Sequence, residues 1–231
     1  MSSSPHTPLS PREVYELLLR NYGEQHWWPA DSAFEMMVGA ILTQNTSWTN
    51  VEKAIANLKA KQMLDCELIA SCNLSELGEV IRPSGSYLQK ARYLQHFALF
   101  YYENGGREGL IKWPASSLRA RLLAVHGIGP ETADSMLLYA LDKPVFVVDA
   151  YTKRLFSRLG HFAPELPYDN VQQYLTQRLP ESLPLYQEFH ALIVEHAKRF
   201  CRSKPLCNDC PLMPHCPAAK PAANLTLEHN A

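Results

Sequence analysis

A glycine turn and an aspartate that follows it are the residues best suited to chemistry in this sequence. Residues 122–134 read Leu-Leu-Ala-Val-His-Gly-Ile-Gly-Pro-Glu-Thr-Ala-Asp, and Asp149 ends the apolar run 145–148. One helix is predicted to end at His126, and Pro130 is suited to begin the next because its missing N–H is not needed there. Such a turn leaves free backbone N–H groups at a helix N-terminus, where a phosphate oxygen binds readily. The pattern indicates a helix–hairpin–helix that contacts nucleic acid.

Both features also have a purely structural interpretation. A Gly-x-Gly sequence between two helices is a common way to end a helix, so the turn alone does not identify a nucleic-acid contact. Asp149 is equally well placed to cap the helix that is expected to begin at Ala150. A capping role and a catalytic role for this carboxylate are compatible with each other.

Taken together, residues 127–133 and the sequence Val-Asp-Ala-Tyr at 148–151 resemble the hairpin-plus-aspartate signature of the endonuclease III superfamily of DNA glycosylases. The resemblance implies an all-α fold with two helical lobes and a cleft between them that holds Asp149. It implies a helical-barrel lobe at 25–143 that contains the hairpin, and a second lobe built from 1–24 and 144–220. Residues 221–231 are expected to form a disordered tail.

In this family Asp149 matches the catalytic aspartate. Positive charge develops on the sugar when an N-glycosidic bond breaks, and a carboxylate stabilises that charge and orients or deprotonates the attacking water. Bifunctional members also carry a lysine in the hairpin, which forms a Schiff base and cuts the strand. Glu131 occupies that place here, which predicts a monofunctional glycosylase. A displaced amine such as Lys153 is the remaining alternative.

A tryptophan-rich segment narrows the resemblance. The sequences His-Trp-Trp-Pro at 26–29 and Gly-Ala-Ile-Leu-Thr-Gln-Asn-Thr at 39–46 are similar to the 3-methyladenine glycosylase branch known as MagIII. The resemblance implies an aromatic base pocket on which an electron-poor alkylated purine stacks. Its expected residues are Trp27, Trp28, Pro29 and Trp48. The alternative for the tryptophans is a place in the core.

The resemblance also implies a set of DNA contacts. Gln44 matches the residue that enters the duplex where the target nucleotide has left, and its amide can bond the orphaned base. An exposed or capping glutamine is the alternative. The loop 85–91 resembles a loop that meets DNA, although Ser86 is small where a wedge residue is often apolar. The expected DNA-binding residues are Gln44, Gly127, Ile128, Gly129, Glu131, Thr132, Lys90, Lys153 and Lys198.

The C-terminal cysteines suggest a metal centre. They follow the spacing Cys-x5-Cys-x2-Cys-x5-Cys and are Cys201, Cys207, Cys210 and Cys216. Four thiolates on such a short loop suit a [4Fe–4S] cluster, whereas structural zinc sites usually present two short Cys-x-x-Cys knuckles. The family's iron–sulfur loop has a first interval of six residues, one more than here. A [4Fe–4S] cluster is therefore expected, with zinc or unmetallated thiols as the alternatives.

Composition limits the classes of function only weakly. The chain has 231 residues, 46% of them hydrophobic, and a net charge of −1. It contains no apolar run long enough to span a membrane and no signal peptide, so we expect a cytoplasmic protein. We also expect a monomer that is associated with the nucleoid, and its expected partner is duplex DNA that contains a damaged base. The alternatives to an alkylpurine glycosylase are an endonuclease III-like glycosylase/AP lyase for oxidised pyrimidines, a T or U mismatch glycosylase, and a non-catalytic DNA-binding module.

Hydrophobic periodicity predicts the helices that must position these residues. Apolar residues recur at helical spacing along most of the chain, and no convincing strand alternation occurs. The expected class is all-α. The predicted helices are 11–20, 33–42, 47–60, 65–70, 74–81, 86–104, 116–125, 130–141, 149–158, 168–179 and 183–200.

Overall fold

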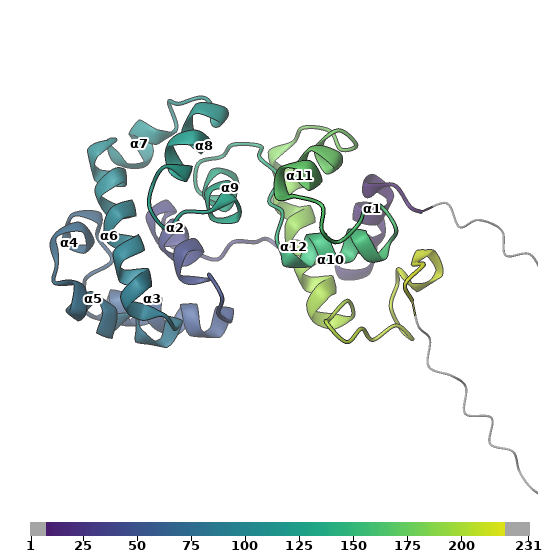
Figure 1. Ribbon diagram of the computed structural model, residues 1–231, viewed down its shortest axis with the longest axis horizontal. Helices are drawn as coiled ribbons and strands as arrows, with labels where there is room; N and C mark the ends of the chain where they lie inside the picture. Colours follow the sequence, from purple (N-terminus) through teal and green to yellow (C-terminus); the bar gives the residue numbers. More distant parts are fainter. Residues whose placement is uncertain (1–7, 220–231) are drawn as a thin grey trace, which may run out of the picture. The chain divides into compact units, whose positions relative to one another are not determined.

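The computed structural model describes residues 8–219, and every regular element in this range is a helix. The all-α prediction is confirmed for this part of the chain (Figure 1). The tail predicted at 221–231 lies outside the described residues. No helix in the described range is long and apolar enough to cross a membrane.

The described helices run in chain order from the N-terminus. They are α1 (Pro11–Tyr22), α2 (Ala33–Leu42), α3 (Trp48–Ala60), α4 (Cys66–Ser71), α5 (Leu74–Val80), η1 (Arg82–Ser84), α6 (Tyr87–Glu103), α7 (Gly106–Leu110), α8 (Ala115–Leu123), α9 (Pro130–Tyr139), α10 (Ala150–Arg158), α11 (Tyr168–Thr176), α12 (Leu183–Arg199) and η2 (Met213–His215).

The helices group into two compact units. The middle unit comprises residues 27–147 and 182–187, and the split unit comprises residues 8–26, 148–181 and 188–219 of the described chain. The sequence analysis placed the crossings between lobes near residues 25 and 144. The structure divides the chain two to four residues later and groups residues 182–187 with the middle unit.

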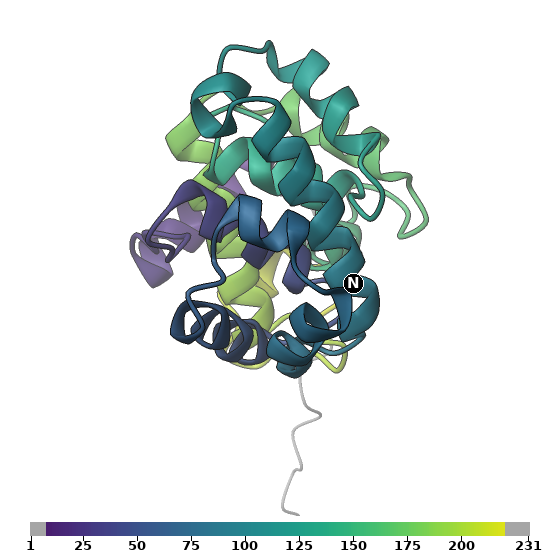
Figure 2. The same ribbon diagram turned by 90° about the vertical axis from the view of Figure 1, so that its left-hand side faces the viewer.

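The middle unit is built around α2, whose apolar residues cover almost its whole circumference. Nine of its ten residues are buried, and it packs against α3, α6 and α9 (Figures 1 and 2). A helix that is apolar on all sides must lie inside a core. Ser32 begins the helix by accepting a hydrogen bond from the Glu35 N–H at 3.1 Å. This buried helix ends at Leu42, directly before the loop that carries Gln44.

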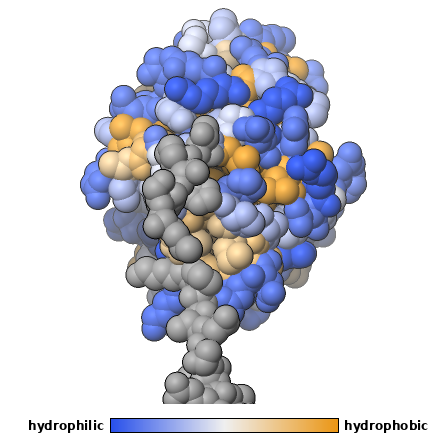
Figure 3. Space-filling view, turned by 90° about the vertical axis from the view of Figure 1, so that its right-hand side faces the viewer, coloured by the Kyte–Doolittle hydropathy of each residue, from blue (hydrophilic) through white to orange (hydrophobic). Residues whose placement is uncertain are grey.

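In the split unit, α1 joins the chain's N-terminal segment to α12. A capping box between Ser10 and Glu13 begins α1. The Tyr15 ring lies 5.3 Å from that of Phe189, and the Gln25 N–H donates to Glu188 at 2.6 Å. The unit is therefore assembled from segments more than 160 residues apart in sequence. On the face that Figure 3 shows, apolar residues are set among hydrophilic ones.

Several helix ends differ from the predictions. The sequence analysis missed α7, because the adjacent Gly105 and Gly106 favour a turn. Both adopt positive φ (75° and 62°), and the short helix begins directly at the second of them. The predicted helices ending at 141 and 179 are shorter in the structure, where they end at Tyr139 and Thr176. Helix ends are the least constrained part of a periodicity prediction.

Candidate functional site

The predicted hairpin lies between α8 and α9, and its two glycines have different surroundings. Gly127 has a φ of 93°, and a Cβ built on it would lie 2.1 Å from the Tyr93 ring. Gly129 is the exposed N-cap of α9, with an ordinary φ of −93° and no heavy atom within 4 Å of a built Cβ. The fold therefore requires a glycine at 127 but not at 129.

Buried contacts fix the two helices on either side of this turn. Ile128 is buried in the core of the middle unit. Arg119 on α8 donates two hydrogen bonds to the buried carboxylate of Asp134 on α9, at 2.7 and 3.1 Å. A bidentate pair of this kind fixes orientation as well as distance. The helix–hairpin–helix is thus a rigid support for the backbone N–H groups at the start of α9.

Gln44 is attached to the hairpin in this structure. Its amide Nε2 donates to the Gly127 carbonyl at 3.0 Å and to the Thr132 hydroxyl at 3.2 Å. Thr132 is buried, while Gly127 is partly exposed. These contacts bring three predicted DNA-binding residues together. They also engage the amide group that the sequence analysis expected to bond an orphaned base, so that role stays a prediction.

Lys90 requires a correction. It was expected to bind DNA, but its side chain is buried and its ammonium group donates to the carbonyls of Leu42 at 2.8 Å and Ser84 at 2.6 Å. Burial lowers the pKa of this amine to about 8. Lys90 is therefore committed to the loops that end α2 and η1 and is not available to a phosphate.

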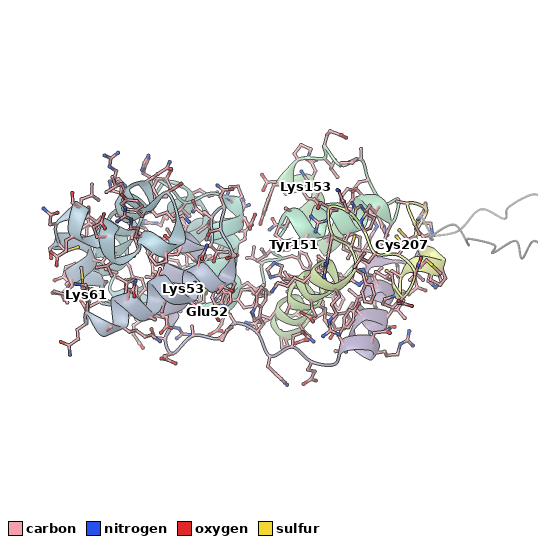
Figure 4. All side chains as sticks on the ribbon, turned by 90° about the horizontal axis from the view of Figure 1, so that it is seen from below. Glu52, Lys53, Lys61, Tyr151, Lys153 and Cys207 are labelled. Carbon is pink, nitrogen blue, oxygen red and sulfur yellow. The ribbon has the colours of Figure 1, made fainter. Side chains whose placement is uncertain are left out.

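The other charged residues of the predicted DNA-binding set are accessible. Glu131 is exposed in the first turn of α9, where an acid is favoured by the helix dipole. Lys153 lies half-buried on α10, near Tyr151 in sequence (Figure 4). Lys198 is exposed in the last turn of α12.

Asp149 is the N-cap of α10 and is almost completely buried. Its Oδ1 accepts a hydrogen bond from the Thr152 N–H at 2.6 Å, which is the capping interaction that the sequence analysis considered. Its Oδ2 lies 3.6 Å from Nε2 of His190 on α12. Burial alone would raise the pKa of this carboxyl, but the His190 imidazole and the Thr152 N–H outweigh burial and lower it. Asp149 is thus a buried carboxylate held in its charged form.

Sequence reasoning missed His190. It lies within the apolar run of α12 and is itself buried beside Phe189. A histidine in an apolar helical stripe was a weak signal, and nothing in the spacing linked it to Asp149, which lies 41 residues earlier.

The predicted base-pocket tryptophans form one aromatic cluster in the middle unit. The rings of Trp27 and Trp28 are stacked with centroids 5.2 Å apart, and Trp48 meets Trp28 edge-on at 5.2 Å. Trp28 and Trp48 pack against the core, whereas Pro29 is exposed. Tyr139 adds a fourth ring, 5.4 Å from that of Trp28. Core packing was the alternative interpretation of the tryptophans, and it applies to part of the Trp28 and Trp48 side chains.

A cavity of about 260 Å³ adjoins this cluster within the middle unit. Trp28 and Tyr139 line it together with the polar side chains of Ser32, Arg107 and Asp142. Arg107 donates to the Ala140 carbonyl at 3.0 Å and forms an ion pair with Asp142. The volume is close to the lower end of the range, about 300 Å³, for small-molecule pockets.

The four C-terminal cysteines line a single apolar cavity in the split unit. The apolar side chains that share it are Leu155, Leu159, Phe200, Leu206, Leu212 and Met213. All four thiols are free, and burial raises the pKa of Cys210 to about 11. Within residues 8–219, no group of three or more His, Cys, Asp or Glu side chains is arranged to hold a single metal ion.

Residues around the cysteines tie this segment to α10 and α12. Arg154 donates to the Cys201 carbonyl at 2.7 Å, and Arg158 approaches the Cys201 Sγ at 3.3 Å. His196 lies 3.8 Å from the Cys210 Sγ and shares a hydrogen bond of 2.8 Å with the Tyr22 hydroxyl. These contacts position the cysteine segment from two helices of its own unit, and Tyr22 of α1 in turn holds His196.

Comparison with known proteins gives the hairpin and the aspartate a family. The profile of the HhH-GPD superfamily of base excision DNA repair proteins matches residues 38–181, which include Gln44, the hairpin and Asp149. The chain belongs to this superfamily. Members of the HhH-GPD superfamily are DNA glycosylases of base excision repair, and the predicted endonuclease III-type assignment is confirmed at this level.

Individual relatives support the same assignment over nearly the whole chain. A Methanocaldococcus jannaschii protein with the provisional name DNA repair glycosylase is 50% identical over 207 residues, which cover 88% of this chain and 94% of the relative. Endonuclease III of Thermotoga maritima is 30% identical over 207 residues, covering 89% of each chain. The match therefore covers most of this HhH-GPD protein and most of each of these two relatives.

Solved structures confirm the fold. The 3-methyladenine DNA glycosylase MagIII of H. pylori, bound to 1,N6-ethenoadenine, superimposes with a TM-score of 0.72 at 32% identity and covers 83% of this chain and 98% of its own. An endonuclease III–DNA complex gives a TM-score of 0.78 at 22% identity, covering 91% and 96% of the two chains, and shows the fold alone. The HhH-GPD profile itself includes neither the tryptophans at 27 and 28 nor the four C-terminal cysteines.

Proposed function

We propose that this HhH-GPD glycosylase is monofunctional and removes a damaged base, by preference an alkylated purine, from duplex DNA as a monomer. The observation that carries the proposal is the buried Asp149 carboxylate, bonded by Thr152 and faced by His190, in a chain that has Glu131 where bifunctional relatives carry a lysine. A carboxylate can stabilise a positively charged sugar, but it cannot form an imine.

In the proposed reaction, the bond between the base and the sugar breaks and its electron pair leaves with the base. A positively charged alkylated purine therefore departs as a neutral base, and positive charge develops on the sugar. Asp149 stabilises that charge and accepts the proton of the water that attacks the anomeric carbon. The Thr152 N–H holds one carboxylate oxygen at 2.6 Å, which fixes the side chain in one orientation. No lysine takes part, and the sugar–phosphate strand stays intact.

Duplex DNA is held through its backbone in this proposal. The backbone N–H groups at the start of α9, next to the exposed Gly129, bind phosphate oxygens. Lys153 and Lys198 neutralise further phosphates. These contacts set the register of the protein on DNA without reading the sequence of bases.

The aromatic cluster supports an alkylated purine as the substrate. Electron-poor rings stack well on indoles, and Trp27 stacks on Trp28 beside a cavity of about 260 Å³. The similar MagIII structure contains ethenoadenine, a modified purine. The similarity to endonuclease III favours oxidised pyrimidines as the second candidate, and that to a thymine-DNA glycosylase of Aeropyrum pernix, 27% identical, favours mismatched thymine.

We propose that the cysteine cavity binds a [4Fe–4S] cluster. Four thiols around one apolar cavity fit a multi-iron cluster, whose ligands are spread over several metal atoms. A zinc ion would need all four sulfurs about 2.3 Å from one point, a tighter arrangement than the separate iron atoms of a cluster require. Cys201, Cys207, Cys210 and Cys216 would hold the cluster, which would stabilise the fold of their segment. Iron and acid-labile sulfide in the purified protein would support this; stoichiometric zinc would contradict it.

Base release from single-lesion duplexes tests the proposed activity. The panel contains an alkylated purine, an oxidised pyrimidine, and a T or U mismatch, each assayed under single-turnover conditions. We expect release of the alkylated purine by the wild type and none by Asp149→Asn, with DNA binding retained because the hairpin is unchanged. Asp31→Asn is the control, since it makes the same change at an exposed carboxylate paired with Lys59. Base release that persists in Asp149→Asn would leave this residue with its capping role and no catalytic one.

A further inference from the structure

We propose that His190 is a positioning residue that holds the Asp149 carboxylate in its charged form and in one orientation. This inference rests on the proposed function, in which Asp149 is the catalytic carboxylate. It adds a residue from α12 to a reaction that the sequence attributed only to the start of α10.

The geometry places one nitrogen beside each carboxylate oxygen. The Thr152 N–H holds Oδ1 from α10, and Nε2 of His190 faces Oδ2 at 3.6 Å from α12. Asp149 and His190 are 8% and 4% exposed, so water does not compensate either group fully. Two supports from different helices restrict rotation of the carboxylate more than a capping bond alone would.

The charge on Asp149 depends on this arrangement. Burial favours the neutral acid and raises the pKa of Asp149, and the His190 imidazole is the largest of the influences that oppose it. Without the imidazole, burial would be opposed mainly by Thr152, and the pKa of Asp149 would rise. A larger fraction of the enzyme would then carry a neutral acid, which cannot stabilise a cationic sugar.

Two of the other charged groups on the neighbouring elements have partners of their own. On α10, Arg154 bonds the Cys201 carbonyl, and on α12, Glu188 accepts the Gln25 N–H. Lys153 follows Thr152 and is half-buried. At the start of α11, the Tyr168 hydroxyl accepts the Val148 N–H at 3.2 Å, and on α1 the Tyr15 ring meets Phe189. His190 is the basic side chain that faces the carboxylate at ion-pair distance.

Two substitutions separate positioning from packing. His190→Leu removes the donor and keeps an apolar side chain, whereas His190→Gln retains an N–H donor without a charge. His161→Leu is the control, because it makes the same change at another partly buried histidine of the split unit, which bonds Tyr174 at 2.9 Å.

Single-turnover base release is then measured from about pH 4.5 to 8 with the duplex that the wild type processes best. We expect the acidic limb of the pH–rate profile to move up by roughly one pH unit in His190→Leu, with a fall of roughly tenfold in the maximal rate. His190→Gln should retain most of the wild-type maximal rate and an acidic limb close to the wild-type position. His161→Leu should change neither the maximal rate nor the acidic limb. A wild-type pH–rate profile in His190→Leu would overturn the inference. Equal losses of rate in all three variants, in proportion to their losses of thermal stability, would also overturn it.

Titration of Asp149 by carboxyl-carbon NMR keeps this test separate from the proposed function. The resonance is assigned by its disappearance in Asp149→Asn, and no DNA is needed. A higher titration midpoint in His190→Leu would support the positioning role even if no duplex of the panel were a substrate. An unchanged midpoint would refute that role while leaving the glycosylase assignment intact.

Discussion

The two hairpin glycines offer a test in which stability and DNA binding separate. Gly127→Ala places a Cβ 2.1 Å from the Tyr93 ring in a residue with a φ of 93°. Backbone strain of about 1–3 kcal/mol and overpacking of about 1–3 kcal/mol together predict a loss of about 2–6 kcal/mol in the free energy of unfolding. For a chain of this size, each kcal/mol lowers Tm by about 2–4 °C. Gly127→Ala should therefore lower Tm by roughly 5–20 °C.

Gly129→Ala should have the opposite profile. Its φ of −93° suits alanine, and a built Cβ has no heavy atom within 4 Å. The small cost of alanine at an N-cap and the gain from a less flexible unfolded chain nearly cancel, which leaves Tm almost unchanged. If a phosphate approaches the backbone here, the methyl group removes about one charge-assisted hydrogen bond, worth about 1.5–3 kcal/mol, and weakens binding roughly 10- to 100-fold.

Thermal unfolding and duplex binding at fixed salt measure the two effects. Because the hairpin is proposed to contact phosphates, the loss in Gly129→Ala should be equal for undamaged and damaged duplexes. The double variant Tyr93→Ala with Gly127→Ala should recover part of the stability lost in Gly127→Ala, since the ring that the Cβ meets is gone. Wild-type binding by a stably folded Gly129→Ala would refute phosphate contact at this turn.

Three further predictions follow from other contacts. Arg119→Met should lower the free energy of unfolding by about 3–5 kcal/mol in thermal unfolding, because it leaves the buried Asp134 carboxylate without this partner. The control Arg12→Met, in the exposed pair with Glu16, should lower it by less than about 1 kcal/mol. The buried Lys90 has a pKa near 8, whereas the unfolded amine keeps its proton up to a higher pH. As pH rises from about 8 to 10, the free energy of unfolding of the wild type should therefore increase by up to about 3 kcal/mol relative to that of Lys90→Met. A difference between the two proteins that does not change with pH would contradict this. Borohydride should trap no covalent adduct with DNA and strands should break only after alkali, whereas trapping that is lost in Lys153→Ala would identify a displaced nucleophile.

Much of the fold could be predicted because its helices carry strong local signals. The apolar stripe of α2, the Ser10–Glu13 capping box and Pro130 at the start of α9 are properties of neighbouring residues. For the predicted helices, the structure then changed only the ends. The short α7 was missed because Gly105 and Gly106, which normally break a helix, here begin one.

The candidate site was predictable only where one segment contains it. Asp149, the hairpin and the four cysteines each belong to a short continuous pattern. The roles of His190 and Lys90 depend on partners elsewhere in the chain. His190 faces the Asp149 carboxylate, 41 residues earlier, and Lys90 donates to the carbonyls that end α2 and η1. A lysine in a loop that resembles a DNA contact looks solvent-exposed until those carbonyls are located.

The separation of α1 from α12 in sequence bears on how the chain is made. Tyr22 bonds His196 across 174 residues, so α1 is synthesised well before its partner α12. Closing a loop of that length costs roughly 4–5 kcal/mol of chain entropy. Residues 27–147, the continuous part of the middle unit, are synthesised in the meantime, while Tyr15 of α1 still lacks the Phe189 ring that it meets in the folded chain. A nascent chain that stops before Glu188 would therefore present an unpartnered amphipathic helix to proteases and chaperones.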